Sequence, residues 1–265
     1  MDIIQAVILA IIEGITEFLP ISSTGHLIIG SSWMGIERQD FTKLFEVAIQ
    51  LGAILAVVVL YWRRFFDRNR LNFYIKLIIA VIPALIVGYL FADRIDQLLE
   101  SPVTVGATLL LGGIVLLFVD NWFKQPVVRE EQQLDIFKAL RIGFWQCIAM
   151  IPGVSRSAAT IIGGMQQKLT RSFAAEFSFF LAVPTMVAAT GYKLLKAWKT
   201  TPEILTDRHN LLLLVVGNAV AFVVAMIAIR TFITYLQKHG FRMFGYYRIL
   251  VGIVILIMVW KGMLV

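Results

Sequence analysis

Long apolar runs recur along the chain, separated by short polar and basic segments. A helix that crosses the roughly 30 Å hydrocarbon core of a membrane needs about 20 predominantly apolar residues. Runs close to that length cover 44–62, 71–91, 103–119, 173–192, 211–229 and 246–260. The pattern therefore predicts an all-α polytopic membrane protein with about six transmembrane helices.

Two further apolar segments are broken by proline, glycine and hydroxyl side chains. In the first, a short apolar run from Ile3 ends at Glu13, and Pro20 then removes a backbone donor and disfavours helix at Leu19. The second break reads IPGVSRSAAT and covers 151–160. These segments are too interrupted to cross simply, so we expect re-entrant hairpins. Non-helical backbone at membrane depth is stable only inside protein or along a wet cavity.

The two broken segments can be aligned with each other. When Ser22 is matched to Ser155, Glu13 falls on Gln146, and similar apolar stretches follow both breaks. This similarity predicts a tandem repeat within one membrane domain, 1–265. Its copies would be 1–119 and 120–265, with hairpins at 1–34 and 138–168. A re-entrant hairpin does not cross the membrane and three crossings is an odd number, so the second copy would be inserted upside down. The two hairpins would then enter from opposite faces and meet near the membrane midplane.

Composition supports membrane insertion: 59% of the residues are hydrophobic and 15% are charged. In a soluble protein the net charge of +7 would suggest nucleic acid, but here membrane orientation explains the basic linkers, so we exclude nucleic acid. A single cysteine, Cys147, excludes an internal disulfide and any multi-cysteine metal site.

Basic residues gather in the linkers of one side of the predicted membrane protein. They are Arg63, Arg64, Arg68, Arg70, Lys76, Lys124, Arg129, Lys138, Arg141, Lys168, Arg171, Lys238, Arg242 and Arg248. Because cytoplasmic loops are enriched in Lys and Arg, this side should be cytoplasmic. Both termini and the first hairpin would then face outward.

Glu13 and Glu17 lie four residues apart, on one face of a helix, where like charges repel. Each ionised acid at membrane depth costs roughly 3 kcal/mol by insertion scales. A divalent cation, a cationic group or a shared proton would neutralise the pair. The alternative is a shallow hairpin whose acids are wetted at the interface.

A hydroxyl tract, Ser22, Ser23 and Thr24, precedes Gly25 and His26. Its composition is that of a turn that ends in a helix N-cap, and a helix start binds anions such as phosphate. An ordinary capping turn is the plainer interpretation. His26 strengthens the functional one, because an imidazole could accept a hydroxyl proton or donate one to a leaving oxygen.

In the second break, Arg156 stands between Ser155 and Ser157. An arginine in the membrane requires a partner, and its planar fork suits a phosphate. An ion pair with Glu13 or Glu17 is the alternative, and it too would bring the breaks together. A hydroxyl, an imidazole, paired acids and an arginine are the groups that phosphoryl transfer uses. A transporter with broken helices at the midplane is the rival class, and a lipid flippase combines the two.

The motifs EGITEFLPISSTGH, FEVAIQLGAILAVVV, PGVSRSAAT and AAEFSFFLAVP resemble those of the undecaprenyl-diphosphate phosphatase family, the bacitracin-resistance proteins. The resemblance runs over essentially the whole chain. It implies a multi-pass hydrolase of the bacterial inner (plasma) membrane, surrounded by lipid, that converts undecaprenyl diphosphate to the monophosphate carrier of peptidoglycan synthesis. It also implies the two-repeat fold, a site open to the periplasmic side, and resistance to bacitracin.

The same resemblance assigns roles to individual positions. Carried over by motif position, the nucleophile is Ser23, the catalytic histidine is His26, the paired acids are Glu13 and Glu17, the phosphate-stabilising arginine is Arg156, and the substrate contacts are Ser22, Thr24, Gly25, Ser155 and Ser157. Carboxylate ligands suit Mg²⁺ or Ca²⁺, and two glutamates do not choose between them. Attack by an activated water instead of Ser23 stays open, and so does the oligomeric state, with a homodimer as one option.

Overall fold

The computed structural model describes residues 1–99 and 101–264. Within these residues the regular structure is helical, without β-strands. The α-helices are α1 (Ile3–Thr16), α2 (Ser23–Trp33), α3 (Asp40–Ala48), α4 (Gln50–Leu60), α5 (Trp62–Phe65), α6 (Leu71–Leu90), α7 (Ala92–Leu99), α8 (Pro102–Trp122), α9 (Ile136–Ile148), α10 (Arg156–Gln166), α11 (Arg171–Thr200), α12 (Pro202–Thr206), α13 (Arg208–His239) and α14 (Arg242–Trp260). Two short 3₁₀ turns, at Arg68–Arg70 and Glu131–Gln133, complete the set of described helical elements.

Six helical stretches in the described chain are long and apolar enough to cross a membrane. One joins α3 and α4 over Asp40–Leu60, and the others are α6, α8, α11, α13 and α14. The shortest, α14, has 19 residues and at about 1.5 Å per residue spans nearly the whole hydrocarbon core. The predicted all-α, multi-pass membrane protein with six long helices is therefore confirmed.

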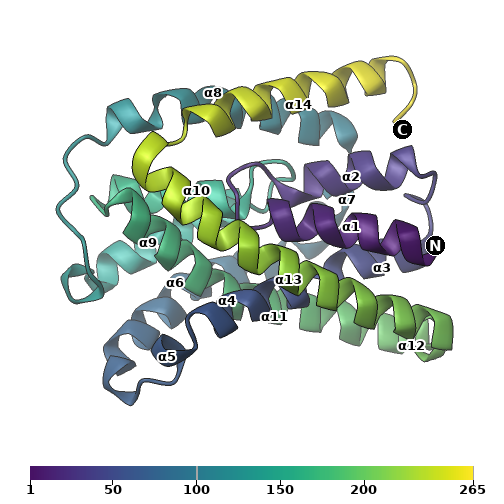
Figure 1. Ribbon diagram of the computed structural model, residues 1–265, viewed down its shortest axis with the longest axis horizontal. Helices are drawn as coiled ribbons and strands as arrows, with labels where there is room; N and C mark the ends of the chain where they lie inside the picture. Colours follow the sequence, from purple (N-terminus) through teal and green to yellow (C-terminus); the bar gives the residue numbers. More distant parts are fainter. Residues whose placement is uncertain (100, 265) are drawn as a thin grey trace.

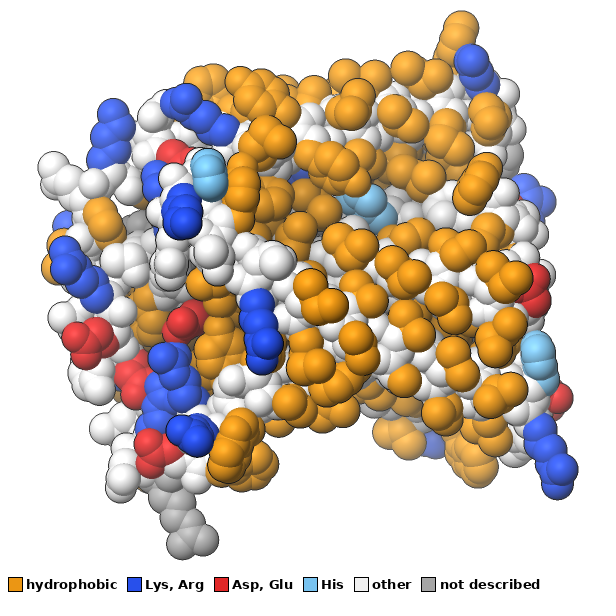
Figure 2. All heavy atoms as spheres, viewed as in Figure 1, with side chains coloured by type: hydrophobic (Ala, Val, Ile, Leu, Met, Phe, Trp, Pro, Cys, Tyr) orange, Lys and Arg blue, Asp and Glu red, His pale blue; other side chains and the backbone are white. Residues whose placement is uncertain are grey.

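The helices run along one axis between two polar ends. Figure 1 shows both termini and α12 at one end, and α5 with the 123–135 segment at the other. On the face in Figure 2, apolar side chains cover the middle and charged ones gather toward the ends, most of all near α5. Large apolar side chains such as Leu111 and Val215 are more than half exposed, as expected where lipid, not water, surrounds the helices.

Two pairs of shorter helices lie among the long ones. The pair α1 and α2 has 14 and 11 residues, and the pair α9 and α10 has 13 and 11. None of these helices is long enough to cross alone. Helix α1 packs against α13 and α9 packs against α6, so both broken segments are held inside the bundle.

Both short pairs break in the same unusual way. The residue before α2, Ser22, has φ of 67°, and the residue before α10, Ser155, has φ of 74°. Positive φ is uncommon for residues other than glycine. These are the two serines that the sequence alignment of the breaks matched. The two segments therefore have similar helix lengths and the same rare backbone conformation at the matched position.

Candidate active site

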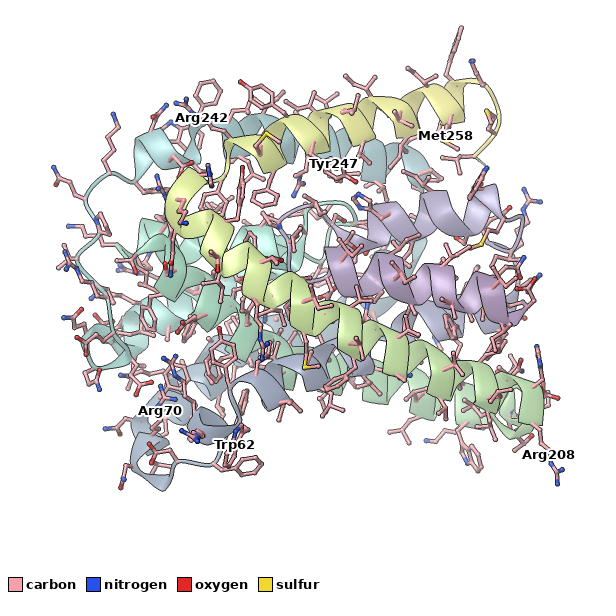
Figure 3. The ribbon with its side chains drawn as sticks, viewed as in Figure 1. Trp62, Arg70, Arg208, Arg242, Tyr247 and Met258 are labelled. Atoms are coloured by element: carbon pink, nitrogen blue, oxygen red, sulfur yellow. The ribbon has the colours of Figure 1, made fainter. Side chains whose placement is uncertain are left out.

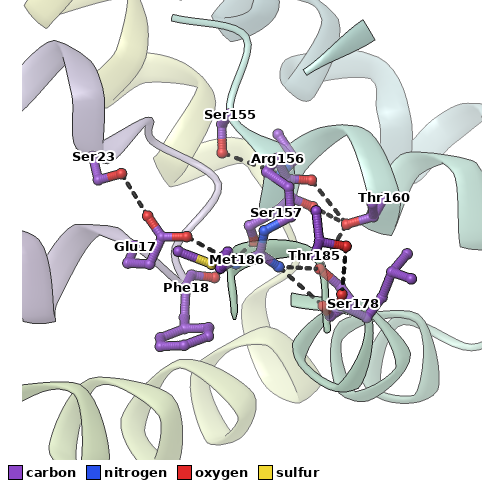
Figure 4. Close-up of polar contacts among 12 residues, drawn as sticks. Glu17, Phe18, Ser23, Ser155, Arg156, Ser157, Thr160, Ser178, Thr185 and Met186 are labelled. Atoms are coloured by element: carbon purple, nitrogen blue, oxygen red, sulfur yellow. Dashed lines mark hydrogen bonds and ion pairs between the residues drawn. The ribbon is translucent and has the colours of Figure 1, made fainter. Parts of the chain in front are cut away.

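The two breaks touch each other, although they are far apart in the sequence. A guanidinium nitrogen of Arg156, Nη2, donates to Oε1 of Glu17 over 2.9 Å. The hydroxyl of Ser157 donates to the backbone carbonyl of Phe18 over 2.7 Å. Figure 4 shows these contacts between the two residues that directly follow α1, Glu17 and Phe18, and the start of α10. The ion pair that the sequence offered as an alternative role of Arg156 is therefore present.

Glu17 also binds the hydroxyl of Ser23. Ser23 Oγ donates to Oε2 of Glu17 over 2.6 Å, so the two carboxylate oxygens serve Ser23 and Arg156 separately. Both Glu17 and Ser23 are only 8% exposed. A carboxylate that accepts a serine hydroxyl proton is placed to act as a general base for that serine. In this geometry the group beside the candidate nucleophile is an acid.

His26 binds other partners. A carbonyl only accepts hydrogen bonds, so Nδ1 of His26 donates to the carbonyl of Ser22 over 2.7 Å. Its Nε2 lies 2.8 Å from the hydroxyl of Tyr247, and the two rings stack with centroids 5.5 Å apart. Both ring nitrogens are thus engaged, and neither contacts Ser23. Figure 3 labels Tyr247 on α14, a residue that the sequence reasoning missed.

Glu13 is fully buried, and neither of its carboxylate oxygens accepts a hydrogen bond from a donor group of the described residues. Its charged neighbours are Glu17, Glu46 and Arg156. The alternative in which both acids are wetted at the interface is wrong, because Glu13 and Glu17 are enclosed by protein. A buried carboxylate without donors fits a bound cation or a shared proton.

The carboxylates alone do not complete a metal site. Among the described residues no group of three or more His, Cys, Asp or Glu side chains is arranged to hold a metal ion. Glu13 supplies unpartnered oxygens, whereas Glu17 already binds Ser23 and Arg156. The donor set fits a hard cation that takes further oxygen ligands from water or phosphate, which is the preference of Mg²⁺.

Arg156 is oriented from α11. Its Nη1 donates to the carbonyl and hydroxyl of Ser178 over 2.9 and 3.3 Å, and Ser178 also bonds the hydroxyl of Thr160 over 2.6 Å. The guanidinium carbon lies 5.8 Å from the ring centre of Phe18. Because α11 fixes one edge of the fork and Glu17 takes the other, Arg156 has a defined direction toward the first break. Ser178 was not predicted, since a serine in an apolar run carries no signal of its own.

The remaining predicted substrate contacts divide into two groups. Ser22 makes no side-chain cap on α2, so the backbone N–H groups of Ser23, Thr24 and Gly25 form an uncapped helix start that can bind an anion. In the second break the hydroxyls have structural partners: Ser155 Oγ accepts from the N–H of Ala158 and caps α10, and the hydroxyl of Ser157, which is fully buried, donates to Phe18. Of the two helix starts, that of α2 therefore has its N–H groups free of a side-chain cap, whereas that of α10 does not.

One expectation about charge is wrong. Arg248, which the sequence reasoning counted among the basic linker residues, is 0% exposed and lies inside α14. It donates to backbone carbonyls of both breaks. The signal was available, because position 248 falls within the predicted crossing 246–260 and an ionisable residue in an apolar run usually has a specific partner.

Comparison with known proteins identifies the family of the chain. A sequence model of the family described as "Bacitracin resistance protein BacA" matches residues 6–254. A protein of Flavobacterium johnsoniae is 58% identical over 97% of this chain and 96% of its own length. One of Flavobacterium psychrophilum is 60% identical with the same coverage, and one of Bdellovibrio bacteriovorus is 52% identical over 99% of this chain and 98% of its own length. All three are named undecaprenyl-diphosphatase. The chain, with its two buried breaks joined by Glu17 and Arg156, belongs to the BacA family of bacitracin resistance proteins.

Proposed function

We propose that the protein is a membrane phosphatase that hydrolyses undecaprenyl diphosphate to undecaprenyl phosphate and inorganic phosphate. The observation that carries the proposal is the buried chain of contacts from Ser23 through Glu17 to Arg156. Family membership supports it, since relatives of up to 60% identity carry the name undecaprenyl-diphosphatase. In the cell this activity would recycle the lipid carrier of peptidoglycan synthesis and confer resistance to bacitracin.

Ser23 is the proposed nucleophile. Glu17 removes its hydroxyl proton while Oγ attacks the terminal phosphorus, and the bond from that phosphorus to the bridging oxygen breaks. Undecaprenyl phosphate leaves with the proton that Glu17 took, and a phosphoseryl group forms. Water then attacks this phosphorus, Glu17 takes a proton from the water and passes it to Oγ of Ser23, and inorganic phosphate departs. Direct attack by a water that Glu17 or His26 activates is the alternative path, and it needs no phosphoseryl group.

The reaction also requires groups that stabilise the negative charge on the transferring phosphoryl group. Arg156 faces Glu17 and Ser23 from the second break, and the uncapped start of α2 presents backbone N–H groups beside Ser23. A guanidinium and a helix start both stabilise phosphate oxygens. Ser22, Thr24 and Gly25 belong to that start, while Ser155 and Ser157 support the helix that carries Arg156.

A divalent cation, Mg²⁺ or Ca²⁺, would be held by Glu13 with Glu17. When bound, it would neutralise phosphate charge and polarise the terminal phosphorus. The unpartnered, fully buried oxygens of Glu13 support this assignment.

We further propose that the chain is an inverted repeat whose hairpins re-enter the membrane without crossing it. The helix pairs of similar length and the positive φ of Ser22 and Ser155 support the repeat. The basic residues near α5 and within 123–141, at the end away from both termini, favour a cytoplasmic position for that end. The first hairpin, and with it the site, would open toward the periplasm.

The test is phosphate release by detergent-purified protein from undecaprenyl diphosphate. We expect release by the wild type and by Ser32→Ala, a change in the same helix as Ser23 but outside the site, and its near loss in Ser23→Ala. A transporter or flippase would bind the lipid without releasing phosphate. Folded wild-type protein that binds undecaprenyl diphosphate and releases none would therefore overturn the proposal.

A further inference from the structure

Arg248 is enclosed in the bundle and uses its whole guanidinium group on backbone carbonyls. Its Nη1 donates to the carbonyls of Pro20 and Val154 over 3.1 and 2.9 Å. Its Nη2 donates to Gly153 over 2.8 Å and to Thr108 over 3.2 Å, and its Nε donates to Leu109 over 3.4 Å. Its described partners include no carboxylate. A charged group this deep in an apolar helix is costly and usually has a function.

The carbonyls that Arg248 binds occupy matching places in the two breaks. Pro20 lies two residues before Ser22, and Gly153 lies two residues before Ser155. Both serines have positive φ. A backbone that turns this way leaves carbonyls without helical partners, and a sparsely populated conformation persists only where its surroundings hold it. One guanidinium group therefore supplies donors to both unusual turns.

Each of these turns leads directly into a residue of the proposed site. Ser23 follows Ser22 and begins α2, and Arg156 follows Ser155 and begins α10. The Glu17 carboxylate joins the two residues on one side, through bonds of 2.6 and 2.9 Å. Arg248 joins the backbone of the same two turns through a separate set of bonds. The separation of Ser23 from Arg156 is thus set by two links, one from a side chain of the site and one from α14.

We propose that Arg248 is a positioning residue that holds Ser23 and Arg156 in register by bridging the two breaks. The inference rests on the proposed phosphatase function and adds to it a residue whose N–H groups already donate to five backbone carbonyls and so are not free to bind the substrate. A displacement of about 1 Å between reacting groups can cost about 100-fold in rate. Loss of the bridge should therefore reduce kcat more than it reduces substrate binding.

Helix α8 provides the space for this bridge. A Cβ added at Gly112 would collide with Nη2 of Arg248, so Gly112→Ala keeps the arginine but displaces its guanidinium group. Gly106, in the same helix, offers a matched control. A Cβ there would lie 2.9 Å from Cγ of Leu256 and 3.1 Å from Cγ2 of Ile255, both side-chain atoms of α14, and no atom of Arg248 is among its nearest neighbours. Both changes disturb packing between α8 and α14, but only Gly112→Ala displaces the guanidinium group of Arg248.

The experiment compares Arg248→Lys, Gly112→Ala and Gly106→Ala in detergent, with kcat, KM and thermal unfolding measured for each. We expect Arg248→Lys to lose about 100-fold in kcat because lysine has fewer donors and no planar fork. Gly112→Ala should lose at least about tenfold in kcat, and Gly106→Ala should keep its kcat even if its unfolding temperature falls. If Arg248→Lys does not fold, the inference is tested by comparing kcat of the two glycine variants. Equal kcat values in these two variants would overturn it.

A double-mutant cycle separates positioning from general stability. Arg156→Lys retains the positive charge but loses the planar fork. In that background Arg248→Lys should reduce kcat by a much smaller factor than it does in wild type, because the group that Arg248 positions is already impaired. An equal loss in both backgrounds would mean a merely structural role and would overturn the inference. Inactive wild-type protein would instead contradict the phosphatase function, and full activity of a folded Arg248→Lys would contradict only the bridge.

Discussion

Glu17→Gln tests the centre of the site, because Glu17 accepts from Ser23 with one oxygen and from Arg156 with the other. A glutamine has one amide oxygen, so it can accept from only one of these donors. If that oxygen faces Arg156, the amide nitrogen faces Ser23 and the serine hydroxyl must accept a hydrogen bond instead of donating one. The change then removes the general base, which contributes about 10²–10⁴-fold to rate.

The same substitution also leaves a charge without its partner. The Arg156 side chain is 13% exposed and that of Glu17 is 7% exposed, so this ion pair is largely desolvated. Removing one partner of a buried pair costs about 3–5 kcal/mol. We expect the lower end of that range, because Arg156 retains its two bonds to Ser178. Glu17→Gln should therefore unfold at a lower temperature as well as lose activity.

The assay measures phosphate release and thermal unfolding on the same purified sample. Glu176→Gln is the matched control: it breaks an Arg64–Glu176 ion pair of 2.6 Å whose side chains are 46% and 24% exposed. Such a pair contributes about 0–1 kcal/mol, so this variant should stay active and nearly as stable as wild type. If Glu17→Gln keeps activity within about tenfold of wild type, below the contribution expected of a general base, then Glu17 does not activate Ser23 and the mechanism is wrong.

Three further predictions address the nucleophile, the cation and the orientation. Rapid quench with undecaprenyl diphosphate labelled in its terminal phosphate should trap label on wild-type protein and not on Ser23→Ala; activity of Ser23→Ala within about tenfold of wild type would favour attack by water. A chelator should abolish most phosphate release, and Glu13→Gln should do the same at low Mg²⁺, whereas full activity in chelator would mean that the acids share a proton instead. In a Cys147→Ala background, an impermeant thiol reagent added outside should label Glu203→Cys and spare Asn69→Cys, and the reverse labelling would invert the proposed topology.

The sequence by itself determined the membrane architecture. Crossing helices need long apolar runs because lipid offers no hydrogen bonds, so each crossing is visible as composition and length. The breaks are equally local: Pro20 cannot continue a helix, and Gly153, with φ of +86°, adopts a conformation that other residues avoid. Acids and arginines in these apolar stretches could likewise be recognised from the sequence as candidate site residues, because charge in an apolar segment requires compensation.

Only the tertiary structure decided which of these groups meet. Ser23 lies closer in sequence to His26 than to Glu17, yet its hydroxyl contacts Glu17, because the imidazole is held by the carbonyl of Ser22 and by Tyr247 from α14. Arg248 was read as a linker charge, although it bridges breaks 228 and 95 positions away in sequence. Pairings of this kind depend on how distant helices pack, and that packing is a property of the whole bundle that no local pattern of residues encodes.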